Sequence, residues 1–146
     1  MRAGASAGFF PMPRNSPNLR VLVVDDELLI RWSIAETLAA AGHDVLEAGD
    51  GASAIQALKT AVDGRDDVDA VVLDYRLPDS NDLTLLATIR RLSPGSAVIL
   101  MTAFGTPEIA EGALALGAFR VVHKPFDMHD LEPLLLTACG PRGAGP

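Results

Sequence analysis

The sequence predicts an α/β fold, a doubly wound parallel sheet of five strands that helices cover on both faces. Three observations lead to this prediction. The chain has 146 residues, the length of one domain, and 49% of them are hydrophobic, enough for a buried core. Short apolar runs alternate five times with longer segments of helical period, which is typical of parallel sheets with crossover helices.

The first half of the chain contains two strands and two helices. Residues 20–25 are the predicted first strand, because their centre, Val21–Val24, is a continuous apolar run, as expected of a strand that is buried on both faces. A helix is predicted over residues 27–41, where apolar side chains recur at helical spacing. Residues 45–48 are the second strand, and Asp50 is expected to cap a helix that runs to Ala61.

The middle of the chain repeats this alternation. Residues 69–74 are the predicted third strand, residues 83–92 the third helix and residues 96–102 the fourth strand. The fourth helix begins with Thr106 as its cap and Pro107 at its first position, where proline is favoured, and a glycine ends it.

The last strand is predicted at residues 119–122, and the last helix ends near Ala138. Residues 1–18 and 139–146 carry Gly, Ser and Pro without a hydrophobic period, so we expect flexible tails around one domain at residues 19–138.

Composition excludes several classes of protein. The net charge of −7 argues against direct binding of nucleic acid, which needs clustered Lys and Arg. Apolar stretches are too short to span a membrane. One cysteine cannot form an internal disulfide, and we expect no signal peptide because the first residues lack a continuous apolar stretch. The expected location is the cytoplasm.

Polar residues collect at the carboxyl ends of the predicted strands, where sites of doubly wound folds lie. The first strand ends in Asp25 and Asp26, the third in Asp74 and the fourth in Thr102, while the fifth leads into Lys124. In the strand order 2-1-3-4-5, Asp74 would be central. Three converging carboxylates need a cation, and oxygen ligands favour Mg²⁺, or Mn²⁺ in its place.

A phosphoryl group is the natural further partner of such an ion. Lys124 would supply positive charge and Thr102 a hydrogen bond to the phosphoryl oxygens. Asp74 faces the same point and can act as the nucleophile that forms an aspartyl phosphate.

Four segments give the chain a resemblance to the receiver domains of bacterial two-component response regulators. They are Asp25-Asp26, DYRLP at residues 74–78, MTAFG at residues 101–105 and KPF at residues 124–126. The resemblance covers residues 19–138 and is strongest with receivers of the nitrogen-regulation class. It implies a flavodoxin-like, three-layer sandwich.

The resemblance implies a role for each matching residue. Asp74 would take a phosphoryl group from a sensor histidine kinase, a phosphotransfer protein or a small donor such as acetyl phosphate. Asp26 would bind Mg²⁺ directly and Asp25 through water, together with Asp74 and the backbone carbonyl of Arg76.

Other implied features concern Lys124 and the surface of the domain. Thr102 and Lys124 would hold the phosphoryl oxygens, and the bond between Lys124 and Pro125 would be cis. A downstream protein would bind the face made by the fourth helix, the fifth strand and the fifth helix. Since the chain stops soon after the last helix, we expect no output domain.

Three positions depart from the family pattern. Most receivers carry an aromatic residue three positions before the lysine, where this chain has Val121, so the usual coupling to Thr102 is expected to be altered. Asp82 stands at a usual glycine and would have to tolerate a positive φ. Pro133 falls in the last helix, and a helix with Asp130 as its N-cap would place it third, where its missing N–H costs no hydrogen bond.

Two other functions stay open. An Asp-nucleophile phosphohydrolase uses a similar set of residues, but it needs a second Asp where this chain has Arg76. We therefore expect no enzyme activity beyond self-phosphorylation and slow autodephosphorylation. A receiver-like interaction module that takes no phosphate is the other alternative, because Val121 could separate partner binding from phosphorylation.

Overall fold

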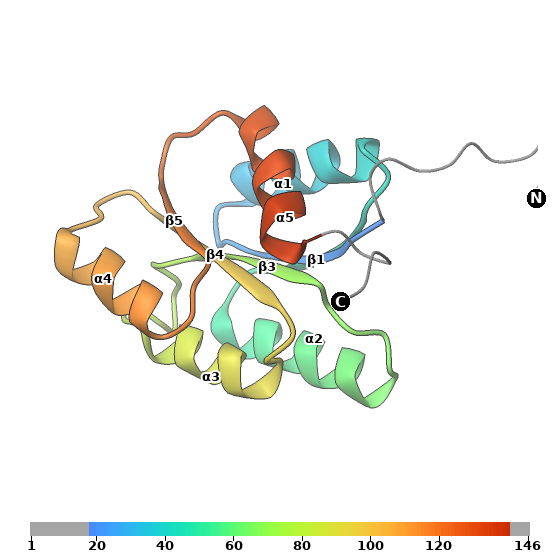
Figure 1. The fold of residues 1–146 in the computed structure, drawn as a ribbon, viewed down its shortest axis with the longest axis horizontal. Helices are drawn as coiled ribbons and strands as arrows, with labels where there is room; N and C mark the ends of the chain where they lie inside the picture. Colours follow the sequence, from blue (N-terminus) through green and yellow to red (C-terminus); the bar gives the residue numbers. More distant parts are fainter. Residues whose placement is uncertain (1–17, 141–146) are drawn as a thin grey trace, which may run out of the picture.

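The computed structural model describes residues 18–140, and most of the two predicted tails lies outside them. A five-stranded parallel sheet forms the centre, in the order β2-β1-β3-β4-β5 (Figure 1). Its strands are β1 (Arg20–Val24), β2 (Asp44–Ala48), β3 (Ala70–Asp74), β4 (Ala97–Thr102) and β5 (Arg120–His123). The predicted fold class and strand order are confirmed.

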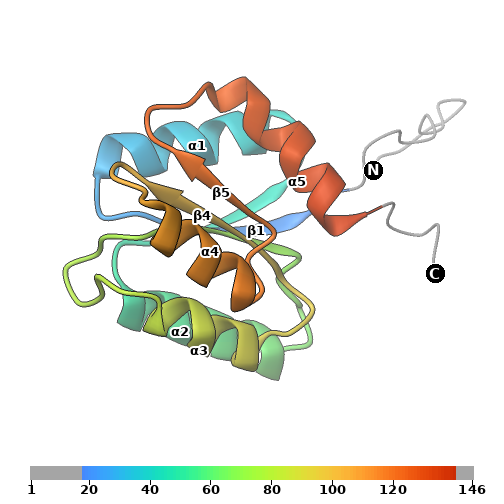
Figure 2. The same ribbon diagram turned by 60° about the vertical axis from the view of Figure 1, so that its left-hand side comes forward.

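Five α-helices cover the two faces of the sheet. They are α1 (Leu28–Ala40), α2 (Gly51–Asp63), α3 (Thr84–Leu92), α4 (Pro107–Ala115) and α5 (Leu131–Cys139). Helices α1 and α5 pack on one face, and α2, α3 and α4 pack on the other (Figures 1 and 2). None of the helices in residues 18–140 is long and apolar enough to cross a membrane.

Side-chain alternation along the strands fills two separate core layers. On β1, Leu22 and Val24 face α2 and α3, while Val21 and Val23 face α1 and α5. Strand β3 is buried along its whole length, as a central strand with helices on both sides must be. This explains why the sequence shows continuous apolar runs instead of alternating ones.

Helix ends agree with the sequence to within one or two residues. The side chain of Asp50 accepts a hydrogen bond from the backbone N–H of Ser53 (2.7 Å), and Thr106 caps α4 through the N–H of Ile109 (3.2 Å). Pro107 is the first residue of α4. The peptide bond between Lys124 and Pro125 is cis, as expected.

The start of α5 differs from the prediction in one respect. The helix is short and places Pro133 third, with Asp130 at its N-cap position, but Asp130 makes no side-chain cap. A single 3-10 turn, Met128–Asp130, precedes the helix and is capped instead by Asp127, which accepts a hydrogen bond from the N–H of His129 (2.9 Å). That turn holds the backbone of Asp130 in a helical conformation. In this conformation its carboxylate does not bind the free N–H groups of the first turn of α5.

The strained turn expected at Asp82 does not occur. Within the described residues, Arg65 is the only non-glycine residue with a positive φ. Asp82 instead accepts a hydrogen bond from the N–H of Thr84 (2.9 Å) at the start of α3. This hydrogen bond lowers the pKa of its carboxyl, and the carboxylate gives the first N–H of α3 a partner that glycine could not provide.

Candidate functional site

The predicted site residues meet at one rim of the sheet. Asp74 ends β3 and Thr102 ends β4, while Asp25 and Lys124 directly follow β1 and β5. The parallel register sets these strand ends level with one another. A pocket of about 470 Å³ opens there, and its lining includes Asp26, Glu27, Asp74, Arg76, Thr102 and Lys124.

The ammonium group of Lys124 is the centre of the site. Its Nζ lies 2.8 Å from Oδ2 of Asp25, 3.2 Å from Oδ2 of Asp74 and 3.3 Å from Oε1 of Glu27. The lysine side chain is only 11% exposed, and the side chain of Asp25 is fully buried. One cation therefore contacts three carboxylates, and two of them, Asp25 and Asp74, are buried where water solvates them poorly, while Glu27 is exposed.

Burial and crowding change the protonation of this cluster. Desolvation, together with the nearby charge of Asp25, raises the pKa of Asp74 to about 6, although Lys124 opposes the rise. Burial alone would lower the pKa of Lys124, but its hydrogen bond to Asp25 and the charge of Asp74 bring it above the ordinary value. At pH 7.5 both groups are charged, so Asp74 is available as a nucleophile.

Two residues that the sequence did not single out hold Asp25 in place. The backbone N–H of Glu27 donates to Oδ1 of Asp25 (2.9 Å). Arg31, one turn into α1, donates from Nη1 to the backbone carbonyl of Asp25 (2.8 Å) and from Nε to Glu47 (3.0 Å). The only signal in the sequence was a third acidic residue after the Asp pair and a basic residue four positions later.

The carboxylates fit a hard divalent cation. Oxygens of Asp25, Glu27 and Asp74 lie within 4.8 Å of one another, and an all-oxygen donor set of this size suits Mg²⁺. Asp26, expected to be the direct ligand, is exposed on the pocket lining and is not part of this cluster of oxygens. The structure thus brings Asp25 and Asp74 together as expected and adds Glu27.

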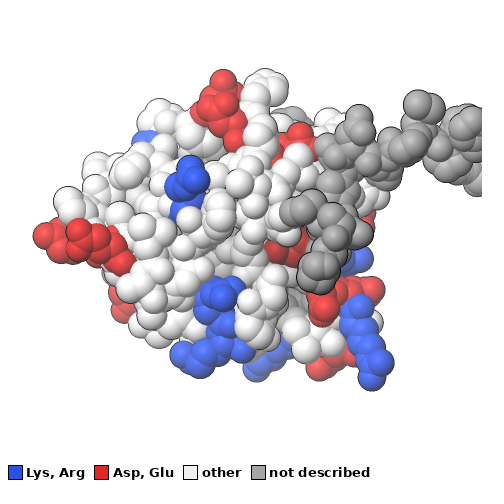
Figure 3. Space-filling view, viewed as in Figure 1, with Lys and Arg blue, Asp and Glu red and all other residues white. Residues whose placement is uncertain are grey.

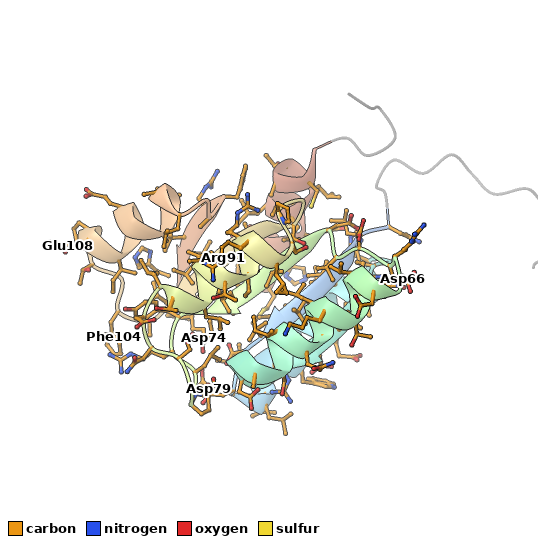
Figure 4. All side chains as sticks on the ribbon, turned by 90° about the horizontal axis from the view of Figure 1, so that it is seen from below. Asp66, Asp74, Asp79, Arg91, Phe104 and Glu108 are labelled. Carbon is orange, nitrogen blue, oxygen red and sulfur yellow. The ribbon has the colours of Figure 1, made fainter. Side chains whose placement is uncertain are left out.

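Thr102, at the end of β4, and Ala103, which follows it, also line the pocket. Oγ1 of the buried Thr102 accepts a hydrogen bond from the N–H of Phe104 (3.2 Å), so its own proton stays available to a ligand. The guanidinium of Arg76 lies 6.0 Å from the centre of the Phe104 ring, which connects the loops after β3 and β4. Figure 4 shows Asp74 and Phe104 at the same end of the molecule.

The residue opposite Thr102 on β5 is His123, whereas Val121 pairs with Leu100, two positions earlier on each strand. Val121 is half-buried and packs against the core layer that includes Ala113 of α4. Gly105 lies so close to the imidazole of His123 that a Cβ atom there would be 2.6 Å from Nε2. A larger residue at this point of the loop after β4 would displace the imidazole of His123.

Comparisons with known proteins identify the family. A family model described as the response regulator receiver domain matches residues 21–135. The DNA-binding transcriptional regulator NtrC of Azospirillum brasilense is 33% identical over 118 residues, 81% of this chain and 24% of NtrC. The transcriptional regulatory protein TcrX of Mycobacterium tuberculosis is 38% identical over 111 residues, 76% of this chain and 45% of TcrX.

A solved structure supports the same assignment of fold. The CheY-like receiver domain protein of Methanospirillum hungatei superposes with a TM-score of 0.76 at 24% identity, over 84% of this chain and 94% of that one. The chain spans about a quarter of NtrC and less than half of TcrX. Because identity to TcrX exceeds identity to NtrC, the predicted likeness to the nitrogen-regulation class has only weak support.

Proposed function

The chain belongs to the response regulator receiver family, and on that premise we propose that it is a phosphoacceptor switch of a two-component phosphorelay. Asp74 would accept the phosphoryl group, and the partner that supplies it would be a sensor histidine kinase or a phosphotransfer protein. The observation that carries the proposal is the ammonium of Lys124 between the buried carboxylates of Asp25 and Asp74, beside an open pocket.

The residues around Asp74 have complementary tasks in this reaction. An oxygen of Asp74 forms the new bond to phosphorus, while the bond from phosphorus to the histidine nitrogen of the donor breaks and its electron pair stays on that nitrogen. Lys124 and the hydroxyl of Thr102 hold the phosphoryl oxygens as charge redistributes. Mg²⁺, held by Asp25, Asp26, Asp74 and the carbonyl of Arg76, would supply charge neutralisation when it is bound.

Phosphorylation would change the balance of charge that the unmodified site has. Lys124 divides its contacts among three carboxylates, and a phosphoryl group on Asp74 offers it a more strongly charged acceptor. A shift of Lys124 would reach β5 directly, and a shift of Thr102 would reach the loop that leads to α4. We therefore propose the α4–β5–α5 face as the surface that a downstream protein reads.

That face has the composition of a docking surface. Figure 3 shows a largely uncharged area over these elements, with one basic patch near β5 and acidic side chains toward its edges. Exposed apolar side chains from α4 and the turn before β5, namely Leu114, Leu116 and Phe119, contribute to it. An apolar centre with a charged rim is typical of protein interfaces.

Intact mass spectrometry tests the phosphoacceptor directly. Wild-type protein with acetyl phosphate and Mg²⁺ should gain the mass of one phosphoryl group, and EDTA should prevent the gain. Asp74→Asn should gain nothing, whereas Asp82→Asn, an Asp of the same loop outside the pocket, should behave as wild type. If the wild type takes no phosphoryl group from a range of small donors, the interaction module that works without phosphate is the better account.

A hydrolysis assay separates the switch from a phosphohydrolase. Arg76 stands where such enzymes need a second acid, so we expect no repeated turnover on phosphomonoesters. Many turnovers per site would contradict the proposal.

A further inference from the structure

A carboxylate from the loop after β3 reaches across to α2. Oδ1 of Asp79 accepts a hydrogen bond from the N–H of Gly51 (2.8 Å), and Oδ2 accepts one from the N–H of Ala52 (3.0 Å). Figure 4 shows Asp79 at the N-terminal end of α2. The contact is close: a Cβ atom on Gly51 would lie 3.2 Å from Oδ1 of Asp79 and 3.2 Å from a methyl group of Leu85, so a larger residue there would push these side chains outward.

The loop that carries Asp79 is continuous with the proposed site. It starts at Asp74, and the N–H of Arg76 points back to Oδ1 of Asp74 at 3.4 Å. Leu77 is buried in the core layer beneath, and its backbone exchanges two hydrogen bonds with Ser80 (2.8 and 3.2 Å). The loop is thus a closed turn. It is attached to β4 through the N–H of Tyr75, which donates to the carbonyl of Met101 (2.8 Å), to the core through Leu77, and to α2 through Asp79.

Helix α2 does not depend on Asp79 alone for its capping. The first backbone N–H groups of a helix have no partner within the helix. Asp50 accepts from the N–H of Ser53 (2.7 Å) and is the ordinary cap of α2. The two contacts of Asp79 therefore do something that Asp50 does not: they connect α2 to the loop of the phosphoacceptor.

We propose that Asp79 is a positioning residue that docks this loop on α2 and so sets the affinity of the site for its divalent cation. The inference rests on the proposed function, in which the carbonyl of Arg76 is a ligand of the ion. Without Asp79, the attachment of the loop to α2 is lost, and that carbonyl and the carboxylate of Asp74 are held less firmly. Residues that orient ligands in this way affect metal affinity although they never touch the metal.

Two alanine variants separate positioning from capping. Asp79→Ala and Asp50→Ala each remove one negative charge and one carboxylate from the N-terminus of α2, but only Asp79 belongs to the loop. We expect isothermal titration with Mg²⁺ to give a Kd about tenfold higher for Asp79→Ala, the low end for residues that orient ligands. Asp50→Ala should stay within about twofold of wild type, since it holds no ligand.

A second measurement needs no metal. In EDTA, the backbone amides of Leu77 and Ser80 should exchange hydrogen faster in Asp79→Ala than in wild type, and Asp50→Ala should leave them unchanged. Asp79→Asn keeps an acceptor oxygen and should give intermediate results in both measurements, which maintains the test if the alanine variant does not fold.

The outcomes distinguish this inference from the proposed function. Equal Mg²⁺ affinity in Asp79→Ala and Asp50→Ala, with wild type binding the ion, overturns the positioning role and leaves the phosphoacceptor proposal intact. A wild-type protein that binds no Mg²⁺ overturns the proposed cofactor, and the amide exchange of Leu77 and Ser80 then decides independently whether Asp79 docks the loop.

Discussion

Replacing Asp74 by Asn should stabilise the metal-free protein at neutral pH. Asp74 and Asp25 are both buried and share the ammonium of Lys124. Burial and the charge of Asp25 raise the pKa of Asp74 to about 6 from its ordinary value of 3.8. Because Asn resembles the protonated carboxyl in shape and charge, the substitution removes the charge that the folded site tolerates poorly.

The magnitude follows from that pKa. Each pH unit is worth ~1.4 kcal/mol, so the rise from 3.8 to about 6 corresponds to at most about 3 kcal/mol. Solvent at the open pocket screens the charge, which reduces the expected gain from Asp74→Asn to about 1–2 kcal/mol. A folded-state pKa above the unfolded one means that the folded protein binds more protons. Wild-type stability should therefore fall as pH rises from about 4 to 6, and then level off.

Urea unfolding in EDTA at pH 4, 5, 6 and 7.5 measures this difference. The free energies of unfolding of wild type and Asp74→Asn should be similar at pH 4 and diverge in favour of the variant above it. Asp82→Asn serves as the control. The pKa of the Asp82 carboxyl is lowered in the folded protein, so removing its charge should destabilise the protein at neutral pH. The reasoning is wrong if Asp74→Asn is less stable than wild type at pH 7.5, or if the difference does not change with pH.

Three further variants test other contacts of the site. Lys124→Met leaves the carboxylates of Asp25 and Asp74 uncompensated. In urea unfolding it should destabilise the metal-free protein by about 3 kcal/mol at pH 7.5 and by less at pH 5. An unchanged stability would contradict the compensating role of the ammonium. Arg31→Gln should lower the free energy of unfolding by about 1–2 kcal/mol. Arg31→Lys should not restore this stability, because one ammonium cannot replace the two donors of the guanidinium, and full stability in the lysine variant would count against the contacts of Arg31 with Asp25 and Glu47. Phe104→Ala removes the ring beside Arg76 and should shorten the lifetime of the phosphoprotein by about two- to fivefold in timed mass spectra. Phe104→Tyr, which keeps a ring, is the control, and equal lifetimes of Phe104→Ala and wild type would show that the ring does not protect the phosphoryl group.

The strand ends were the part of the site that the sequence could locate. A parallel sheet brings its carboxyl ends to one rim, so Asp25, Asp74 and Thr102 had to lie close together once the alternation of strands and helices was recognised. Lys124 follows the edge strand β5, and its contacts with both Asp25 and Asp74 agree with that expectation. Burial on both faces made these strands visible as continuous apolar runs.

Contacts between helices and the loops after the strands could not be predicted from the sequence. Asp79 binds the N-terminus of α2, and Arg31 binds the backbone after β1, through distances that depend on how helices pack against the sheet. Asp82 showed the same limit, because a carboxylate that caps the next helix and a residue with positive φ look alike in a sequence. Asp130 was assigned correctly by position, but the turn before it decides where its side chain points.

The central claim is that Asp74 carries the phosphoryl group, and the location of that group tests it most directly. Borohydride reduces an acyl phosphate of aspartate to homoserine, which peptide mass spectrometry can place in the sequence. After treatment with acetyl phosphate and Mg²⁺, we expect homoserine at position 74 and at no other aspartate. Homoserine at position 25 or 26 instead, or no homoserine in a protein that has gained phosphoryl mass, would contradict the assignment of Asp74 as the phosphoacceptor.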